Sequence, residues 1–449
     1  MSAANCEDMK SQIFFDGLIE KYLPEKLVKL YDKIKHFIPV AMLIGMGRLF
    51  FLLLFFVLAR FTFGDSFGLF TVVFALSQLT GIACMFGTGP TASVVIPQAI
   101  ERGRNSRVAR YLKFSFYTTA LGVITMVLFC FILEYSFSIF NWREGQRIIE
   151  GLMFFGPIMA VSMLREFLAR AFERPVLAFL PRDICWCVLL MACVAFIPSF
   201  RFDIIISAAI VLLFVEICAW LVFWRQELRH FTSIKYKGKI WVKEWKNRSF
   251  ALLMNYLGGL GFERVDVIAV GLLGGLNLAA IYSVANRIAP LISMSQRFIV
   301  PVLSPRISRA FASKDTSKVQ KEVFSGLTFS LLYAGTFFVF VMLFAEDLMG
   351  MFGPEFIIGA NILRILAFAH LMIALGSNFG VILLVGPTPW VYARTIWFAL
   401  IFAIIALTFA IPASGLEGAA IVVVIGIAFY NIANGVFAKN SLDKMKSSE

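Results

Sequence analysis

Charged residues inside apolar stretches are the most informative chemistry in this chain of 449 residues. A charge at the centre of a bilayer costs roughly 2.5–3.5 kcal/mol by insertion scales, so such residues usually face a cavity or a partner. Five basic residues in apolar stretches are expected to form a cationic cavity: Arg48, Arg264, Arg287, Arg297 and Arg364. Three acids are expected to act as their charge partners or as coupling groups: Glu216, Glu263 and Asp266.

A cavity lined in this way would be net positive and would attract an anionic ligand. The planar guanidinium group presents a fork of N–H donors that suits phosphate. Asn255, Glu263 and Asp266 follow one another at steps that place them on one helical face. The amides expected to add a polar lining are Asn255, Asn286 and Asn361.

Two alternatives remain open for these charges. Glu263 or Asp266 can pair with Arg264 or Arg287 and serve only to hold the helices together. Arg297 can reach the inner interface instead of the cavity, because long basic side chains extend toward water.

Several other polar residues in the apolar stretches are expected to be structural. Arg165 and Glu166 lie at the inner end of a predicted span and are interpreted as an interfacial pair. His370 is interpreted as a packed core histidine rather than a proton carrier. The cysteines show neither metal-ligand spacing nor a disulfide pattern, so we interpret them all as reduced packing residues: Cys6, Cys84, Cys130, Cys185, Cys187, Cys193 and Cys218.

The composition places these residues in a membrane protein. Hydrophobic residues make up 60% of the chain and charged residues 15%, whereas soluble domains average about 25% charged residues. The apolar runs are long enough to cross a bilayer as helices, which takes roughly 20 residues. We therefore predict an all-α polytopic protein with about 12 spans, near 37–59, 67–87, 114–134, 149–169, 176–198, 204–224, 250–273, 277–303, 324–345, 358–385, 391–411 and 417–437.

The loops fix a predicted orientation. With a cytoplasmic N-terminus, the inner segments hold 31 Lys and Arg residues and the outer segments hold 4. Basic residues concentrate in cytoplasmic loops, so both termini are expected in the cytoplasm. This bias accounts for most of the formal net charge of +13, and no nucleic-acid partner is needed.

The chain divides into two halves of six spans. We predict a cytoplasmic amphipathic segment at 1–36, an N-terminal lobe at 37–224, a basic cytoplasmic linker at 225–249, a C-terminal lobe at 250–437 and a cytoplasmic tail at 438–449. Because six is even, both halves have the same membrane orientation, and a substrate site is expected in a central cavity between them.

Enzyme motifs are missing from the sequence. It contains no G-x-x-x-x-G-K-[ST] phosphate loop, no H-E-x-x-H and no G-x-S-x-G. The outward loops are short, which weighs against a catalytic domain on that side. We therefore expect a transporter, with no cofactor and no metal.

Three ordered stretches resemble a known family. One is Phe352-Gly353-Pro354-Glu355-Phe356 with Leu363-Arg364-Ile365-Leu366, and another is Gly47-Arg48 with Ala59-Arg60 and Phe67-Gly68. The central stretch is Glu263-Arg264-Val265-Asp266, Gly271, Gly275, Tyr282, Ala285-Asn286-Arg287, Pro301 and Pro305-Arg306-Ile307-Ser308. Together they resemble the polysaccharide-unit (O-antigen) flippases of the multidrug/oligosaccharidyl-lipid/polysaccharide exporter superfamily. The likeness runs in order from about 40 to 390, and the N-terminal extension departs from the pattern.

The resemblance implies a substrate and a mechanism. The substrate would be a polyprenyl-diphosphate-linked oligosaccharide, moved from the inner to the outer leaflet of a bacterial inner membrane by alternating access. Membrane lipids, a coupling H⁺ or Na⁺ and polysaccharide polymerase machinery are the implied partners. The alternatives are a cation-coupled multidrug exporter, which would prefer an acidic cavity, a membrane-embedded polymerase or transferase, and a non-transporting scaffold for polysaccharide assembly.

Overall fold

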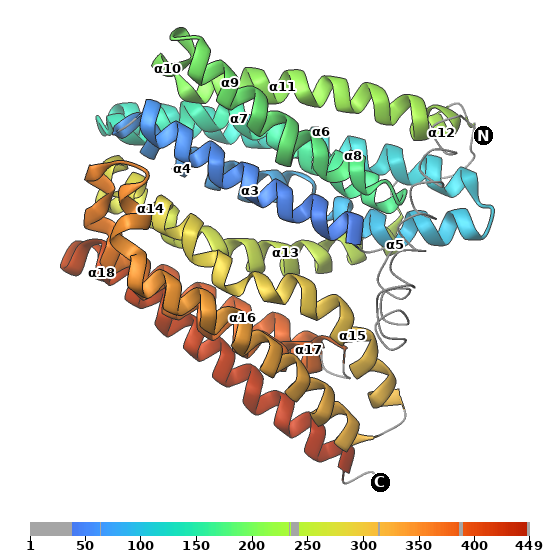
Figure 1. The fold of residues 1–449 in the computed structure, drawn as a ribbon. Coiled ribbons are helices and arrows are strands. Elements are labelled where there is room, and N and C mark those ends of the chain that lie inside the picture. The colour runs from blue at the N-terminus through green and yellow to red at the C-terminus, as the bar shows by residue number, and fades with distance from the viewer. Residues whose placement is uncertain are drawn as a thin grey trace, which may run out of the picture.

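The chain folds into helices throughout the residues that the structure describes. The computed structural model describes residues 38–62, 64–232, 234, 242–312, 315–385 and 389–446. The predicted amphipathic segment at 1–36 lies outside these residues, as do residues 233 and 235–241 of the predicted basic linker. Figure 1 shows two groups of helices side by side, the first and second halves of the chain.

The first half forms the N-terminal lobe. Its six spans, with their short connecting helices, are α3 (Ile38–Phe61), α4 (Asp65–Cys84) continued by α5 (Thr88–Glu101), α6 (Asn105–Ile139), α7 (Arg143–Ala171), α8 (Pro175–Leu180) with η1 (Pro181–Trp186) and α9 (Cys187–Phe196), α10 (Ser199–Phe202), and α11 (Ile204–Phe223) with η2 (Trp224–Leu228) and α12 (Arg229–Thr232). The first part of the predicted linker, 225–232, is therefore helical.

The second half forms the C-terminal lobe. Its elements are α13 (Lys243–Ala269) with η3 (Val270–Gly274), α14 (Leu276–Ile288) with η4 (Ala289–Met294) and α15 (Ser295–Ala312), α16 (Thr316–Gly350), η5 (Pro354–Gly359) with α17 (Ala360–Val385), and α18 (Pro389–Lys446). Gly415 breaks α18 into two spans with a φ of 58°. The last helix continues through most of the predicted tail at 438–449.

The number of spans matches the predicted twelve. Within the described residues, nine helices are long and apolar enough to cross a membrane by themselves. One of them is α18, which holds two spans. The other two spans are α13 and the run from α14 to α15. They are less apolar because they carry the predicted site charges, among them Arg264 and Arg287.

The two lobes meet at one end and diverge at the other (Figure 1). We call the end where α3 begins and α18 ends the inner end, following the predicted orientation. At the outer end, Arg60 of α3 donates from Nε and Nη2 to the carbonyl of Met351, at 3.1 and 2.9 Å. The rings of Phe56 and Phe352 lie 5.6 Å apart, and those of Phe67 and Phe356 lie 6.2 Å apart. These contacts form an outer seal between the lobes.

The second span, predicted at 67–87, continues past a break near Gly87 as α5. Gly87 has a φ of 72°, and a Cβ there would lie 2.0 Å from the carbonyl oxygen of Ser249. Tyr111 donates its hydroxyl to the Thr88 carbonyl at 2.6 Å, which satisfies one backbone group freed by the break. A backbone break inside a membrane requires such cover by other protein groups.

The outer seal also depends on a close helix contact. A Cβ added to Gly68 of α4 would lie 1.8 Å from the Leu276 carbonyl oxygen of α14, so the two lobes would have to separate. We expect Gly68→Ala to destabilise the purified protein by about 1–3 kcal/mol, the usual cost of overpacking. Thermal unfolding in detergent measures this.

The matched control is Gly335→Ala on α16, where an added Cβ meets no atom within 4 Å. Alanine favours a helix by up to about 1 kcal/mol over glycine, so this variant should be as stable as the parent or slightly more stable. Equal effects of the two substitutions would contradict the close contact.

Candidate functional site

A cavity of about 640 Å³ lies between the two lobes. Small-molecule sites usually occupy roughly 300–1,000 Å³, so its size suits a ligand. A smaller pocket of about 190 Å³ adjoins it on the C-terminal lobe. The two share six lining residues: Arg48, Phe51, Glu263, Arg264, Arg287 and Arg297.

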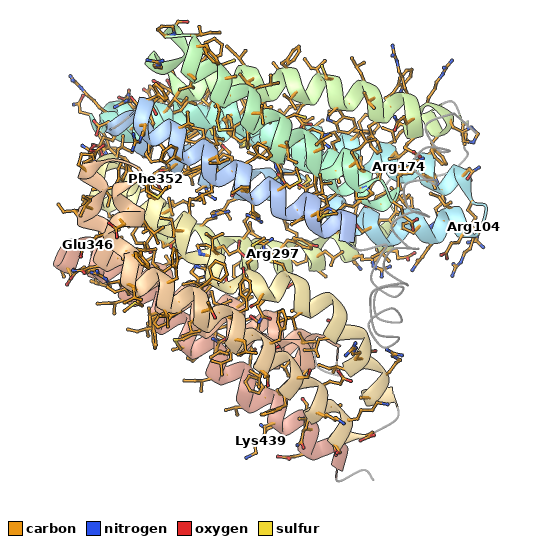
Figure 2. All side chains as sticks on the ribbon, viewed as in Figure 1. Arg104, Arg174, Arg297, Glu346, Phe352 and Lys439 are labelled. Carbon is orange, nitrogen blue, oxygen red and sulfur yellow. The ribbon has the colours of Figure 1, made fainter. Side chains whose placement is uncertain are left out.

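Four of the five predicted arginines line this cavity: Arg48, Arg264, Arg287 and Arg297. Within the described part of the chain, none of the four has a carboxylate oxygen within 4 Å. Arg264 donates from Nε to Oε1 of Gln78, a neutral partner, at 2.8 Å. Figure 2 shows Arg297 between the lobes, where its exposed side chain borders the cavity. The cavity wall therefore carries four basic groups that no direct ion pair neutralises among the described residues.

Arg287 has the most distinctive surroundings of the four. Its guanidinium carbon lies 4.2 Å from the ring centre of Phe55, 5.1 Å from that of Phe51 and 5.7 Å from that of Phe74. Cations are attracted to aromatic faces at such distances. Arg287 belongs to α14 of the C-terminal lobe, whereas the three rings belong to α3 and α4 of the N-terminal lobe. The three rings surround the guanidinium group, which has no hydrogen-bond or ion-pair partner among the described residues.

Among the described residues, neither Glu263 nor Asp266 forms a direct ion pair with these arginines. Asp266 is buried, and its Oδ2 accepts hydrogen bonds from Tyr282 Oη at 3.0 Å and Asn286 Nδ2 at 2.8 Å. The arrangement follows from the sequence, because Tyr282 and Asn286 are one turn apart on α14. Glu263 is exposed to the cavity and forms no ion pair among the described residues.

The predicted asparagines fall in different places. Asn255 lines the main cavity and Asn286 the smaller pocket. His370 also lines the smaller pocket, where its Nδ1 lies 2.9 Å from Oγ of Ser293.

The other two predicted lining residues, Arg364 and Asn361, lie outside the cavity. Arg364 Nη2 lies 3.0 Å from Oε1 of Glu346, and Nη1 donates to Oδ1 of Asn361 at 3.0 Å. Figure 2 places Glu346 at the outer end of the molecule, away from Arg297. The prediction failed because Arg364 stands in the first turns of α17, on a side of that helix that faces α16.

Glu216 is also misassigned, because it pairs with Arg165 instead of with a cavity arginine. Arg165 donates from Nε and Nη2 to the two carboxylate oxygens of Glu216 at 2.7 and 2.9 Å. Ser162 Oγ donates to the same carboxylate at 2.7 Å. Both charged side chains are at most 3% exposed. The predicted interfacial pair of Arg165 with Glu166 is therefore wrong as well.

Glu166 belongs to a second ionic cluster that sequence reasoning missed. It pairs with Arg170 and, at 2.6 Å, with Arg182, whose Nε lies 3.2 Å from Oδ1 of Asp183. These four residues line the inner end of the cavity. The signal in the sequence is Arg182 and Asp183, two charged residues inside the predicted span 176–198.

The sequence and the structure match known transporters. The MatE family model matches residues 252–385, less than half of the chain. The structure superimposes on the inward-facing conformation of a multidrug resistance MATE family transporter of the MOP superfamily, with a TM-score of 0.73 and 15% identity, covering 92% of this chain and 98% of that one. The chain has a MATE-type transporter fold.

Other MATE-type structures are also similar. The lipid II flippase MurJ, in an inward closed conformation, matches with a TM-score of 0.69 and 14% identity over 91% of this chain and 90% of that one. An outward-facing MATE transporter gives a TM-score of 0.57 at 15% identity, over 91% of this chain and 95% of that one. The arrangement of the two lobes is thus more similar to the inward-facing state.

One curated relative is similar in sequence. A probable low-salt glycan biosynthesis flippase, Agl15, from Haloferax volcanii is 22% identical over 183 residues, which are 40% of this chain and 39% of that protein. The match therefore spans well under half of either protein. The matched proteins are transporters and flippases. The described spans of this chain are apolar helices, apart from those that carry the cavity charges, as expected for a polytopic membrane protein.

Proposed function

We propose that this protein is a flippase for polyprenyl-diphosphate-linked oligosaccharides. It would move them from the inner to the outer leaflet of a bacterial inner membrane, by alternating access between its two lobes, and so supply cell-surface polysaccharide synthesis. Membrane lipids surround it, and a polysaccharide polymerase would use its product.

The observation that carries this proposal is the set of four cavity arginines without ion-pair partners among the described residues. An uncompensated charge at membrane depth is expensive, so a set of them is best explained by a ligand that neutralises it. A diphosphate offers several acceptor oxygens, and arginine can bind two of them with one fork. Glu263 and Asp266 nearby offset part of this charge, but four arginines against two acids leave the wall net positive.

Two of the matched proteins support this proposal, because they are described as flippases, one for glycan biosynthesis and one for lipid II. The long hydrophobic tail of a polyprenyl carrier would stay in the bilayer while its headgroup enters the cavity between the lobes.

A second candidate is a cation-coupled multidrug exporter. The MatE match and the TM-score of 0.73 to a multidrug transporter favour it. The cavity argues against it, because a positively charged wall repels organic cations. The third alternative, a membrane-embedded polymerase or transferase, has no support among the matched proteins.

The test is transport by the purified protein in liposomes. A polyprenyl-diphosphate oligosaccharide is labelled in one leaflet and followed into the other, with and without a pH or Na⁺ gradient, and an organic-cation efflux assay runs on the same vesicles. We expect lipid transfer and no cation efflux, and dependence on a gradient would identify the coupling ion. Cation efflux without lipid transfer would establish the exporter instead.

A further inference from the structure

The cavity has two chemically different ends. Arg264 and Arg287 stand at its outer end, while Asn255 and Tyr256 line it nearer the inner end. Asn255 precedes Arg264 by nine residues on α13, a rise of roughly 14 Å at 1.5 Å per residue. A ligand that fills the cavity therefore meets different groups along its length.

Beside Arg297, which lies ten residues past Arg287 toward the inner end, the inner end presents neutral groups with unused hydrogen-bonding capacity. Among the described residues, neither the Asn255 amide nor the Tyr256 hydroxyl has a hydrogen-bond partner. Gln78, between the two ends, uses its Oε1 on Arg264, and its amide nitrogen has no partner in the described part of the chain. Amides and hydroxyls can both donate and accept, whereas arginine only donates. Such groups match sugar hydroxyls, which also do both.

Tyr256 adds an aromatic surface to the same end. Its side chain is 39% exposed, and its ring meets Phe167 of α7 at 5.5 Å and 83°, a T-shaped contact that leaves part of the ring accessible. The C–H groups of a sugar ring pack well on such a surface. Beside it, a Cβ added to Gly259 would meet only Ile396 Cδ1 at 3.8 Å, so there is room next to the tyrosine.

The facing wall of the inner end carries no net charge. Two acids and two arginines from α7 and η1 occupy it and neutralise one another: Glu166, Arg170, Arg182 and Asp183. The side chains of Glu166 and Arg182 are 7% and 15% exposed, so their charges are largely neutralised within the cluster.

We infer that the inner end of the cavity is a sugar subsite, in which Asn255 and Tyr256 recognise the hydroxyls and ring of the first sugar attached to the diphosphate. The inference rests on the proposed function, in which the diphosphate binds Arg264 and Arg287 at the outer end. Asn255 and Tyr256 thereby determine whether the protein distinguishes a sugar-bearing lipid from the bare carrier.

The experiment measures binding of two probes to the full-length protein in nanodiscs: polyprenyl diphosphate, and the same lipid bearing one hexose. We expect the native protein to bind the hexose-bearing lipid about tenfold more tightly, as two or so net hydrogen bonds would give. In Asn255→Ala and Tyr256→Ala the ratio of the two affinities should fall from about ten toward one, while the affinity for the bare diphosphate stays unchanged. Tyr256→Phe, which keeps the ring, should retain part of the preference.

Matched controls are Asn361→Ala and Tyr135→Ala. Asn361 is an amide outside the cavity, and Tyr135 is a 71% exposed residue of α6; neither should change the preference. Arg287→Gln should weaken both probes by the same factor. Two results would overturn the subsite and leave the proposed function standing. The native protein could show no preference for the hexose-bearing lipid, or the Asn255 and Tyr256 variants could keep the preference while Arg287→Gln weakens binding of both probes. Failure of both probes to bind would overturn both.

Discussion

Replacing Arg287 by glutamine should lower transport of the lipid-linked oligosaccharide by about 100-fold or more. A hydrogen bond to a charged group contributes about 1.5–3 kcal/mol, and one guanidinium group makes two of them to a phosphate. Every 1.4 kcal/mol is a factor of ten. The rings of Phe51 and Phe55 hold the guanidinium group in place. A glutamine side chain at this position does not place its N–H donors where the guanidinium group holds them. Initial rates in the liposome assay measure the effect.

Two further substitutions show whether the loss comes from the guanidinium group in this position. Arg287→Lys keeps the charge but not the fork, so we expect an intermediate rate. Arg364→Gln removes an arginine that pairs with Glu346 outside the cavity, and it should transport at close to the native rate. If Arg287→Gln and Arg364→Gln were equally active, the cationic cavity would not be the substrate site.

Replacing Glu216 by glutamine should destabilise the protein by about 3–5 kcal/mol, because it leaves the charge of Arg165 buried without its partner. Arg165 is not exposed at all and Glu216 is 3% exposed, so water cannot compensate. Reversible unfolding in mixed micelles measures the change.

An exposed ion pair provides the control. Glu346→Gln breaks the pair with Arg364, in which the Glu346 side chain is 65% exposed, and such pairs contribute at most about 1 kcal/mol. The double substitution Arg165→Met with Glu216→Leu should recover most of the lost stability, because an apolar replacement of a buried pair is often neutral. A double variant as unstable as Glu216→Gln would show that the loss has another cause.

The sequence predicted the helical architecture and four of the arginines that line the cavity. The spans follow from runs of apolar residues, which are a property of the chain alone. The arginines of the cavity could be located because a charge at membrane depth is stable only in a cavity or beside a partner. Arg48, Arg264 and Arg287 all line the cavity, as their depth in the predicted spans indicated. The predicted lobe boundaries remain predictions.

Partners could not be predicted, because a partner depends on how each helix is rotated about its axis. Arg165 and Glu216 are 51 residues apart and meet only because α7 packs against α11. Arg364 stands in the first turns of α17, near the outer end, on the side that faces α16. Asp266 shares a helical face with Asn255 and Glu263, yet it turns toward Tyr282 of the neighbouring helix.

The outer seal also determines where a transmembrane voltage falls. A cavity lined by exposed charged groups and open toward the inner end takes the electrical potential of the solution on that side. The voltage drop is then concentrated across the apolar contacts of Phe56, Phe67, Phe352 and Phe356. Moving the seal to the other end would carry the cavity arginines through most of the electric field, at about 2.3 kcal/mol per charge for each 100 mV. A bound diphosphate cancels part of that charge, so voltage should act more strongly on the empty carrier than on the loaded one.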